Sequence, residues 1–346
     1  MSQAASRGIQ PNQGNRIASL ANCRSIELPS VYAPIQDELE SVELILRTEL
    51  SSETPFVDKL LQHSWLLGGK RIRPAFLLLS AASCGEINPD HLQMAAALEM
   101  VHTATLVHDD ILDEAKTRRH RDTANAIWGN KTSVLLGDYL FTHSFHLASL
   151  TGSVEAMQLL SRASNRVCEG EMRQNAWQGD FELTEASYLG MITEKTAELC
   201  GVGCRLGALL ADADEDLSDG FEAYGRNLGV AFQVIDDVLD VVGRPEEVGK
   251  TLGTDLVNQK PTLPVIHCLE QSSESEQAEF KKVLVNRDAT NEDVLPYLAG
   301  TNSLQYARRV ARNHARWATD FAQSLEQNKY SVALQELAEF VLQRTH

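Results

Sequence analysis

The chain has no apolar run that approaches the ~20 residues needed to cross a bilayer as a helix. We therefore do not expect an integral membrane protein. A secretory signal core is also missing near the N-terminus. No segment combines strict alternation of apolar and polar residues with many β-branched side chains, so a β-sheet is not expected either.

Positive charge is scarce. The 31 Lys and Arg residues face 48 Asp and Glu residues, which gives a formal net charge of −17. This balance excludes general nucleic-acid binding, which needs a positive surface. It does not exclude a small anionic substrate, because a few local cations are enough to bind one. A hydrophobic content of 43% is typical of a globular protein that buries a sizeable core.

The cysteines form no Cys-x-x-Cys pair and show no spacing typical of metal sites. Most lie among small apolar residues, which favours buried free thiols in a reducing compartment over disulfides. We therefore expect a cytoplasmic protein. The six are Cys23, Cys84, Cys168, Cys200, Cys204 and Cys268.

The first 26 residues contain three arginines and no acidic residue. A transit peptide is one interpretation, but the segment has no clear amphipathic stripe. A flexible tail is favoured. Residues 27–346 are expected to form one helical domain.

Apolar residues at helical spacing predict helices along almost the whole chain. Between residues 29 and 50 they recur every three or four positions, and Asn88 is expected to cap a helix that runs to Asp113. The connectors are short and polar, so the prediction is an all-α bundle with a central cleft. Further periodic segments cover about 131–150, 152–176, 184–211, 216–242, 276–286 and 302–344.

Two copies of the pattern Asp-Asp-x-x-Asp, at 109–113 and 236–240, are the most informative feature of the chain. The first and last Asp of each copy share a helix face, because an α-helix turns roughly 100° per residue. One such pattern alone is more often a solvated face or a helix cap. Here both copies have apolar flanks, and buried carboxylates need a cation to offset their repulsion and desolvation. The pair predicts a hard divalent cation that bridges to a phosphate-bearing substrate.

Cations that could bind those phosphates are placed around the two acidic clusters. The segment 68–74 opens a helix with two glycines before Lys70, and a helix N-terminus favours anions. Arg118-Arg119 follows the first cluster, and three lysines occur after the midpoint: Lys195, Lys250 and Lys260. Any one of these is more often a solvated surface charge. As a set they indicate a site for a phosphate-bearing substrate.

These motifs together resemble those of trans-isoprenyl diphosphate synthases of the polyprenyl synthetase family, and most closely its medium- and long-chain members. The resemblance runs from about Pro29 to the C-terminus, with matching segments in the family's order. They are 68–74, 99–103, 109–113 with 118–119, 129–131, 137–138, 194–197, 232–240, and 253–256 ahead of Lys260.

The resemblance implies an isoprenoid synthase fold and a Mg²⁺-dependent prenyltransferase. Such an enzyme joins isopentenyl diphosphate to an allylic diphosphate, head to tail and in trans. It also implies a homodimer and three Mg²⁺ ions per active site. The metal contacts would be Asp109, Asp113 and Asp236, supported by Asp110, Asp237 and Asp240. The six aspartates and Lys195 would be the catalytic residues.

The same resemblance assigns the remaining positions to the two substrates. His102 lies seven residues before Asp109, two helical turns away on the same face. Isopentenyl diphosphate would bind Lys70, Arg73, His102 and Arg119. The allylic diphosphate would bind Arg118, Lys195, Thr196, Gln233, Lys250 and Lys260.

Product length can be read one helical turn before Asp109, where the growing chain would first meet the helix. Ala104 and Thr105 occupy this floor, and both are small. Family members that stop at fifteen carbons usually carry a bulky aromatic residue there. We therefore expect products of twenty carbons or more, with longer polyprenyl chains favoured.

Two other functions are alternatives. A class I terpene cyclase ionises a similar substrate but typically has one aspartate-rich cluster and does not need the segment 68–74. A non-catalytic regulatory subunit of a heteromeric synthase tends to lose aspartates or cations, and this chain keeps them. One departure from the family pattern is 120–123, which replaces a more usual Gly-Lys-Pro-like turn.

Overall fold

The structure is a computed structural model that describes residues 30–243, 253–286 and 288–343. It is 79% helical, which confirms the predicted all-α fold. The predicted tail over residues 1–26, Cys23 and Lys250 lie outside the described residues.

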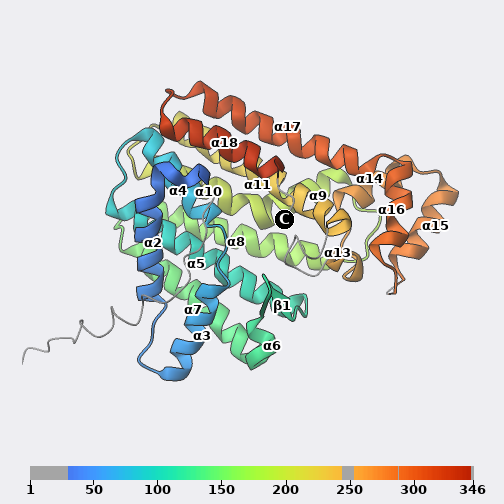
Figure 1. Cartoon of the computed structure of the whole chain (residues 1–346), viewed down its shortest axis with the longest axis horizontal. Coiled ribbons are helices and arrows are strands. Elements are labelled where there is room, and N and C mark those ends of the chain that lie inside the picture. Colours follow the sequence, from blue (N-terminus) through green and yellow to red (C-terminus); the bar gives the residue numbers. More distant parts are fainter. Residues whose placement is uncertain (1–29, 244–252, 287, 344–346) are drawn as a thin grey trace, which may run out of the picture.

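The first half of the chain builds one side of a helical bundle (Figure 1). Its elements are η2 (Ser30–Ile35), α2 (Gln36–Glu49), α3 (Pro55–Leu66), α4 (Ile72–Cys84), α5 (Pro89–Leu112), β1 (Thr117–Arg118), β2 (Arg121–Asp122), α6 (Ala124–Trp128), α7 (Asn130–Ser149) and α8 (Val154–Ala176). The strands β1 and β2 form a two-residue antiparallel hairpin that the sequence did not predict.

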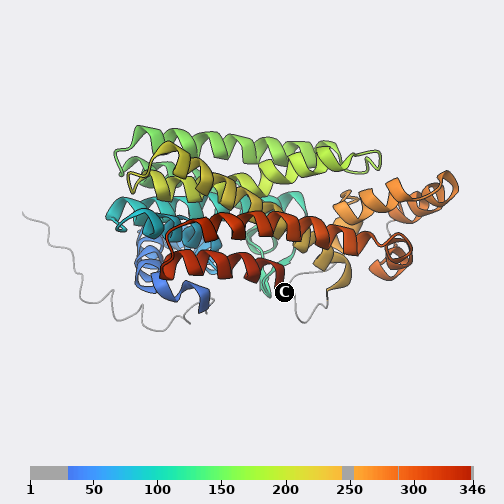
Figure 2. The same ribbon diagram turned by 90° about the horizontal axis from the view of Figure 1, so that it is seen from above.

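The second half completes the bundle and adds a group of short helices at one end (Figure 2). Its elements are α9 (Glu185–Ile192), the π-helical η3 (Thr193–Ala197), α10 (Glu198–Leu209), α11 (Glu215–Val242), α13 (Thr254–Val257), α14 (Leu263–Gln271), α15 (Glu274–Leu284), α16 (Asn291–Gly300), α17 (Ser303–Ser324) and α18 (Lys329–Gln343). Helices α14 to α16 enclose a small apolar core of their own.

The helix predictions hold best where the local signal is strong. Asn88 caps α5 as expected, since its side chain accepts hydrogen bonds from the backbone N–H groups of Asp90 and His91. The segment predicted at 302–344 is two helices, which meet at a turn where Asn328 accepts from the N–H of Tyr330 at 2.8 Å. The segment predicted at 184–211 contains a π-helical turn. Helices α3, α6, α13, α14 and α16 were not predicted.

Small side chains let the central helices pack closely. Helix α10 lies against α4, α8 and α11, and α17 packs along α11 (Figure 1). The face of α17 toward the core is a stripe of alanines, and polar residues occupy much of its other side. The stripe consists of Ala307, Ala311, Ala315, Ala318 and Ala322.

No helix of the described part of the chain is long and apolar enough to cross a membrane.

The described cysteines are all free thiols. Cys200, Cys204 and Cys268 are buried as expected, whereas Cys168 is exposed. The exposed thiol follows from its place on the outer face of α8, which packs on one side only.

Candidate active site

The first acidic cluster lies at the C-terminal end of α5. Asp110 is buried and accepts a hydrogen bond from Nε of Arg118 at 2.7 Å. Burial raises the pKa of Asp110, and the nearby Arg118 partly opposes this rise. Asp109 and Asp113 are only partly exposed, at 20% and 33% of their side-chain surface. One face of the helix end therefore presents two carboxylates, while the third points into the protein.

The second cluster lies near the end of α11, and two of its three aspartates are buried. Asp237 accepts hydrogen bonds from the Tyr188 hydroxyl and from Nε2 of Gln233. Burial, followed by the charge of Asp255, raises the pKa of Asp237 to about 8. Asp236 is half-buried, which leaves it the most accessible member of the trio.

Asp240 organises the chain that follows α11. Its carboxylate accepts hydrogen bonds from the Thr254 hydroxyl at 3.2 Å and from the backbone N–H of Asp255 at 3.1 Å. Its backbone oxygen accepts from the N–H of Gly253 and from Nδ2 of Asn291. These bonds hold α13 against α11. Asp240 thereby positions Lys260, which lies three residues beyond the end of α13.

Two lysines join the acidic cluster of α5 to the rest of the site. Nζ of Lys260 donates to Oδ1 of Asp113 at 2.7 Å. Nζ of Lys195 lies 4.0 Å from Oδ2 of Asp109 and also pairs with Glu171. Burial alone would lower the pKa of Lys195, but the charges of Asp109 and Glu171 outweigh burial and raise it. Lys195 therefore keeps its charge beside the first cluster.

The second cluster lies at the same place. Thr196, next to Lys195, donates its hydroxyl hydrogen to Oε1 of Gln233 at 2.9 Å, and Gln233 in turn binds Asp237. One small pocket is lined in part by Gln174, Gln233, Asp237, Asp255 and Lys260. The two aspartate patterns, far apart in sequence, thus meet around the two lysines.

A second group of cations surrounds His102, two turns before Asp109 on α5. Burial lowers the pKa of His102 well below its usual value, and the charges of Arg73, Arg119 and Arg118 lower it further. The imidazole is therefore neutral. Burial also lowers the pKa of Arg119 to about 10. Three guanidinium groups lie near one neutral histidine and make this place strongly positive. A bound anion would offset the repulsion among the three charges.

The turn between β1 and β2 aims Arg119 at this place. Arg119 and His120 are the two turn residues, and both have positive φ, at 52° and 59°. Two such residues are typical of a type I′ hairpin turn, which non-glycine residues rarely form. Arg119 donates to the backbone oxygen of Leu67 and passes where a Cβ on Gly69 would lie. The hairpin is the local conformation that segment 120–123 adopts, and the glycine makes room for the guanidinium.

Not every cation of segment 68–74 is available to bind a substrate. Arg71 is buried and paired with Glu43 and Glu99, so its role is structural. Nζ of Lys70 lies 5.3 Å from the ring centre of Phe340. Lys70 and Arg73 are both half-buried beside the start of α4.

The structure adds residues that the sequence analysis missed. Glu171 and Gln174 of α8 hold the Lys195 ammonium, Gln174 through a 2.7 Å hydrogen bond. Asn258 lies 3.4 Å from Asp113 beside Lys260. Tyr188 binds Asp237. The three-residue spacing of Glu171 and Gln174 was the only sequence signal, and it is common on any polar helix face.

The donor set of the two clusters fits Mg²⁺, which prefers carboxylate oxygens. Oδ2 of Asp110 is buried and has no hydrogen-bond partner among the described residues. Within the described ranges, no three Asp, Glu, His or Cys side chains converge closely enough to hold an ion by themselves. An ion between the clusters would therefore take further ligands from water or a substrate phosphate, which is usual for Mg²⁺.

The residues expected to set product length lie on α5 one turn before Asp109. Ala104 is buried at 1% exposure, and Thr105 is half-buried with its hydroxyl donating to the backbone oxygen of His102 at 2.8 Å. Leu98 and Val101, further along the same helix, are fully buried. No bulky side chain stands at either floor position.

A sequence model of the polyprenyl synthetase family matches residues 54–300. The octaprenyl diphosphate synthase of Haemophilus influenzae is 35% identical over 312 residues, which are 89% of this chain and 94% of that protein. A decaprenyl diphosphate synthase from Rhodobacter capsulatus superposes with a TM-score of 0.86 at 35% identity, covering 91% of this chain and 98% of that one.

A polyprenyl synthase from Caulobacter crescentus, solved with calcium and isoprenyl diphosphate, superposes with a TM-score of 0.87 at 34% identity. The match covers 94% of this chain and 100% of that structure. In both comparisons the superposition extends over more than nine tenths of this chain.

Proposed function

This chain belongs to the polyprenyl synthetase family and is a prenyltransferase, and from this premise we propose how its site works. It condenses isopentenyl diphosphate with an allylic diphosphate, head to tail and in trans, to give a polyprenyl diphosphate of twenty carbons or more. The observation that carries the assignment of the site is the pair of lysine contacts, Lys195 with Asp109 and Lys260 with Asp113.

The proposed allylic site is the space between the two acidic clusters. Lys195, Lys260 and Thr196 come from two different segments and lie at its edge. Their charges and hydroxyl would bind the diphosphate and stabilise the negative charge that grows as the allylic C–O bond breaks. Mg²⁺, held by Asp109, Asp113 and Asp236, would supply Lewis-acid stabilisation of the same leaving group. We propose three ions, in keeping with the Mg²⁺ dependence of the family.

The proposed isopentenyl site is the positive place around His102. Arg73 and Arg119 would bind its diphosphate together with Lys70, while the neutral imidazole can donate one hydrogen bond. The isopentenyl double bond then attacks the allylic carbocation and forms the new C–C bond. A proton leaves the adduct and restores the double bond. Since no described side chain stands out as its base, the departing pyrophosphate is the proposed acceptor.

The proposed elongation path starts at Ala104 and Thr105. Because both side chains are small, no bulky group blocks the path at the turn of α5 that directly precedes Asp109. We propose that the product passes this level and has twenty carbons or more, with longer chains favoured, in line with the octaprenyl and decaprenyl synthases named above.

One experiment tests the function directly. Pure protein is incubated with Mg²⁺, isopentenyl diphosphate and either a ten-, fifteen- or twenty-carbon allylic primer, and the products are sized after dephosphorylation. A polyprenyl series with consumption of isopentenyl diphosphate supports the proposal. A cyclic hydrocarbon made without isopentenyl diphosphate would identify a terpene cyclase. No turnover without a second protein would identify a regulatory subunit.

We also propose that the enzyme is a homodimer. Helix α7 exposes three large apolar side chains, of which Leu135 is 69% exposed, Val134 43% and Tyr139 37%. Apolar side chains gathered on one helix are typical of an association surface. Light scattering on a size-exclusion column measures the mass in solution. We expect a dimer for the parent protein and a shift toward monomer for Leu135→Glu.

A location in the cytoplasm is a further proposal, tested by cell fractionation.

A further inference from the structure

The segment that carries Lys195 and Thr196 is a π-helical turn inside a longer helix. Residues Thr193–Ala197 form this turn between α9 and α10. A π turn adds one residue to the helical repeat, so the side chains on either side are rotated relative to an uninterrupted helix. Such turns are uncommon and need support from the surrounding structure.

Two glycines provide that support by letting neighbouring helices touch the backbone of the turn. A Cβ on Gly170 of α8 would lie 2.5 Å from the backbone nitrogen and 2.9 Å from Cα of Lys195. A Cβ on Gly229 of α11 would lie 2.5 Å from Cα of Ala197. Because these contacts are with backbone atoms, no side-chain rotation could relieve them. Helices α8 and α11 therefore approach the backbone of the turn from two sides, closer than a Cβ at either glycine would allow.

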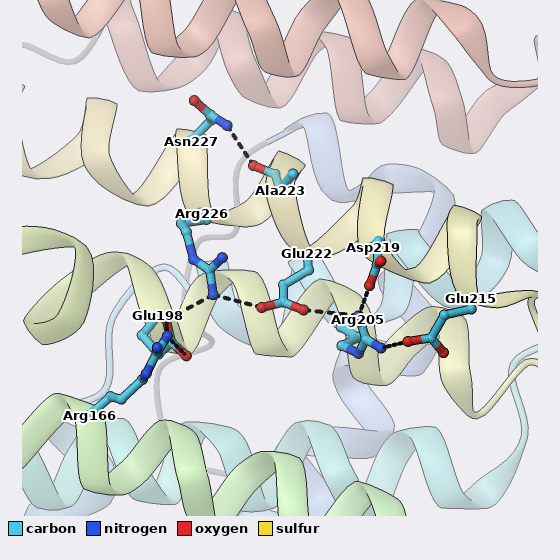
Figure 3. Close-up of polar contacts among 9 residues, drawn as sticks. All are labelled: Arg166, Glu198, Arg205, Glu215, Asp219, Glu222, Ala223, Arg226 and Asn227. Atoms are coloured by element: carbon cyan, nitrogen blue, oxygen red, sulfur yellow. Dashed lines mark hydrogen bonds and ion pairs between the residues drawn. The ribbon is translucent and has the colours of Figure 1, made fainter. Parts of the chain in front are cut away.

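An ionic contact fixes the next residue to the same two helices. Glu198 is buried at 4% exposure and accepts from Arg166 of α8 at 3.1 Å and from Arg226 of α11 at 3.0 Å (Figure 3). Arg226 also pairs with Glu222, which continues the network to Arg205. Arg166 and Arg226 are 53% and 33% exposed, but the Glu198 carboxylate is buried. Loss of a partner would leave this buried charge less compensated, so the contact resists movement of the turn.

We propose that Gly170, Gly229 and Glu198 are positioning residues for the allylic diphosphate. They clamp the π turn between α8 and α11 and thereby aim Lys195 and Thr196 at the leaving group. The inference rests on the proposed function, because it assumes that these two side chains bind the allylic diphosphate. It does not involve the isopentenyl site, whose residues come from α4 and the segment just before it, from α5 and from the β1–β2 turn.

The test substitutes alanine for Gly170 and compares it with Gly190→Ala. Gly190 lies on α9, just before the turn, and a Cβ there would meet nothing within 4 Å. Both substitutions favour a helix to the same degree, so their difference reports the contact with Lys195. Binding of an unreactive allylic thiolodiphosphate is measured by calorimetry in the presence of Mg²⁺. The Michaelis constants of both substrates are measured in parallel.

We expect Gly170→Ala to weaken binding of the thiolodiphosphate and to raise the KM of the allylic substrate by about tenfold or more. A misplacement of 1 Å can cost on the order of 100-fold. The KM of isopentenyl diphosphate should stay within about twofold, which a general loss of structure would not allow. Gly190→Ala should match the parent protein in every constant.

A second variant decides the matter should Gly170→Ala fail to fold. Glu198→Gln removes the ionic contact without adding volume, and we expect the same selective loss of allylic binding. Its control is Asp219→Asn, which removes a contact of Arg205 at the far, exposed end of the same network. The proposal is overturned where Glu198→Gln binds the thiolodiphosphate like the parent protein.

Lys195→Ala separates this inference from the proposed function. Loss of thiolodiphosphate binding in Lys195→Ala, with normal binding in Gly170→Ala and Glu198→Gln, would overturn only the positioning role. Normal binding in Lys195→Ala would overturn the assignment of the allylic site and the positioning role together.

Discussion

Nζ of Lys260 lies 2.7 Å from Oδ1 of Asp113, although 147 residues separate them in the chain. The contact joins the segment after the second acidic cluster to the last aspartate of the first. It shows that the two aspartate patterns border one site, since Lys260 also lines a pocket with Asp237. Without substrate, the ammonium group of Lys260 can neutralise Asp113. When a diphosphate binds, the same group can pair with the diphosphate.

Replacing Lys260 by alanine should raise the KM of the allylic substrate by roughly 10- to 100-fold. A hydrogen bond to a charged group contributes about 1.5–3 kcal/mol, and each 1.4 kcal/mol is tenfold in binding. Steady-state kinetics with a fixed excess of isopentenyl diphosphate measure the effect. Lys281→Ala is the control, because Lys281 pairs with the exposed Glu182 away from the site. Equal KM values in the two variants would contradict the role of Lys260.

Asp109→Asn should reduce kcat by several orders of magnitude and leave the fold intact. The side chain is partly exposed, so the amide replaces a carboxylate without disturbing the core, but it removes a charge that would hold Mg²⁺. Turnover and far-UV circular dichroism are measured together. Asp90→Asn, in the first turn of the same helix, should retain full activity. Retained turnover in Asp109→Asn would refute the metal assignment.

Ala104→Phe should shorten the product. The phenyl ring would extend from the first turn before Asp109 into the proposed path and stop elongation there. Because Ala104 is buried, overpacking costs about 1–3 kcal/mol of stability, so Thr105→Phe at the half-buried neighbour is a second variant. Product lengths are compared by chromatography. The exposed Ala299→Phe serves as the control. An unchanged product distribution in both floor variants would place the path elsewhere.

Stability should fall with acid because of His91. Its Nδ1 accepts from the backbone N–H of Asn88 at 3.0 Å, and its Nε2 donates to the Gly207 oxygen at 3.1 Å. Burial lowers the pKa of His91 in the folded state, so the unfolded chain binds the proton more readily. The stabilisation is therefore present above the unfolded pKa of about 6.5 and is lost as the pH falls.

Thermal unfolding of the metal-free protein between pH 5 and 7.5 measures this effect. The melting temperature of the parent protein should fall toward pH 5, and His91→Gln should show a weaker dependence on pH. His146 is exposed, so His146→Gln should follow the parent curve. Parallel curves for the parent and His91→Gln would show that other groups set the acid sensitivity.

Sequence reasoning predicted much of this protein from local patterns. The cap at Asn88, the helix that ends at the first aspartate pattern and the helix that carries the second all follow from spacings of three or four residues. The turn at 325–328 was missed because α17 and α18 are both amphipathic and no proline or glycine separates them. The β1–β2 hairpin was missed because neither turn residue is one that the conformation usually requires.

Residue identity and helical period are properties of the chain itself, and they determined the all-α class, the two acidic clusters and the set of cations around them. Tertiary structure decided which lysine meets which aspartate, that Arg71 is a buried structural cation while Arg119 turns toward His102, and that a π turn carries Lys195. The physical reason is that helical periodicity acts over a few residues. Contacts between helices depend instead on how closely backbones approach, and that distance is set by the packing of the whole bundle.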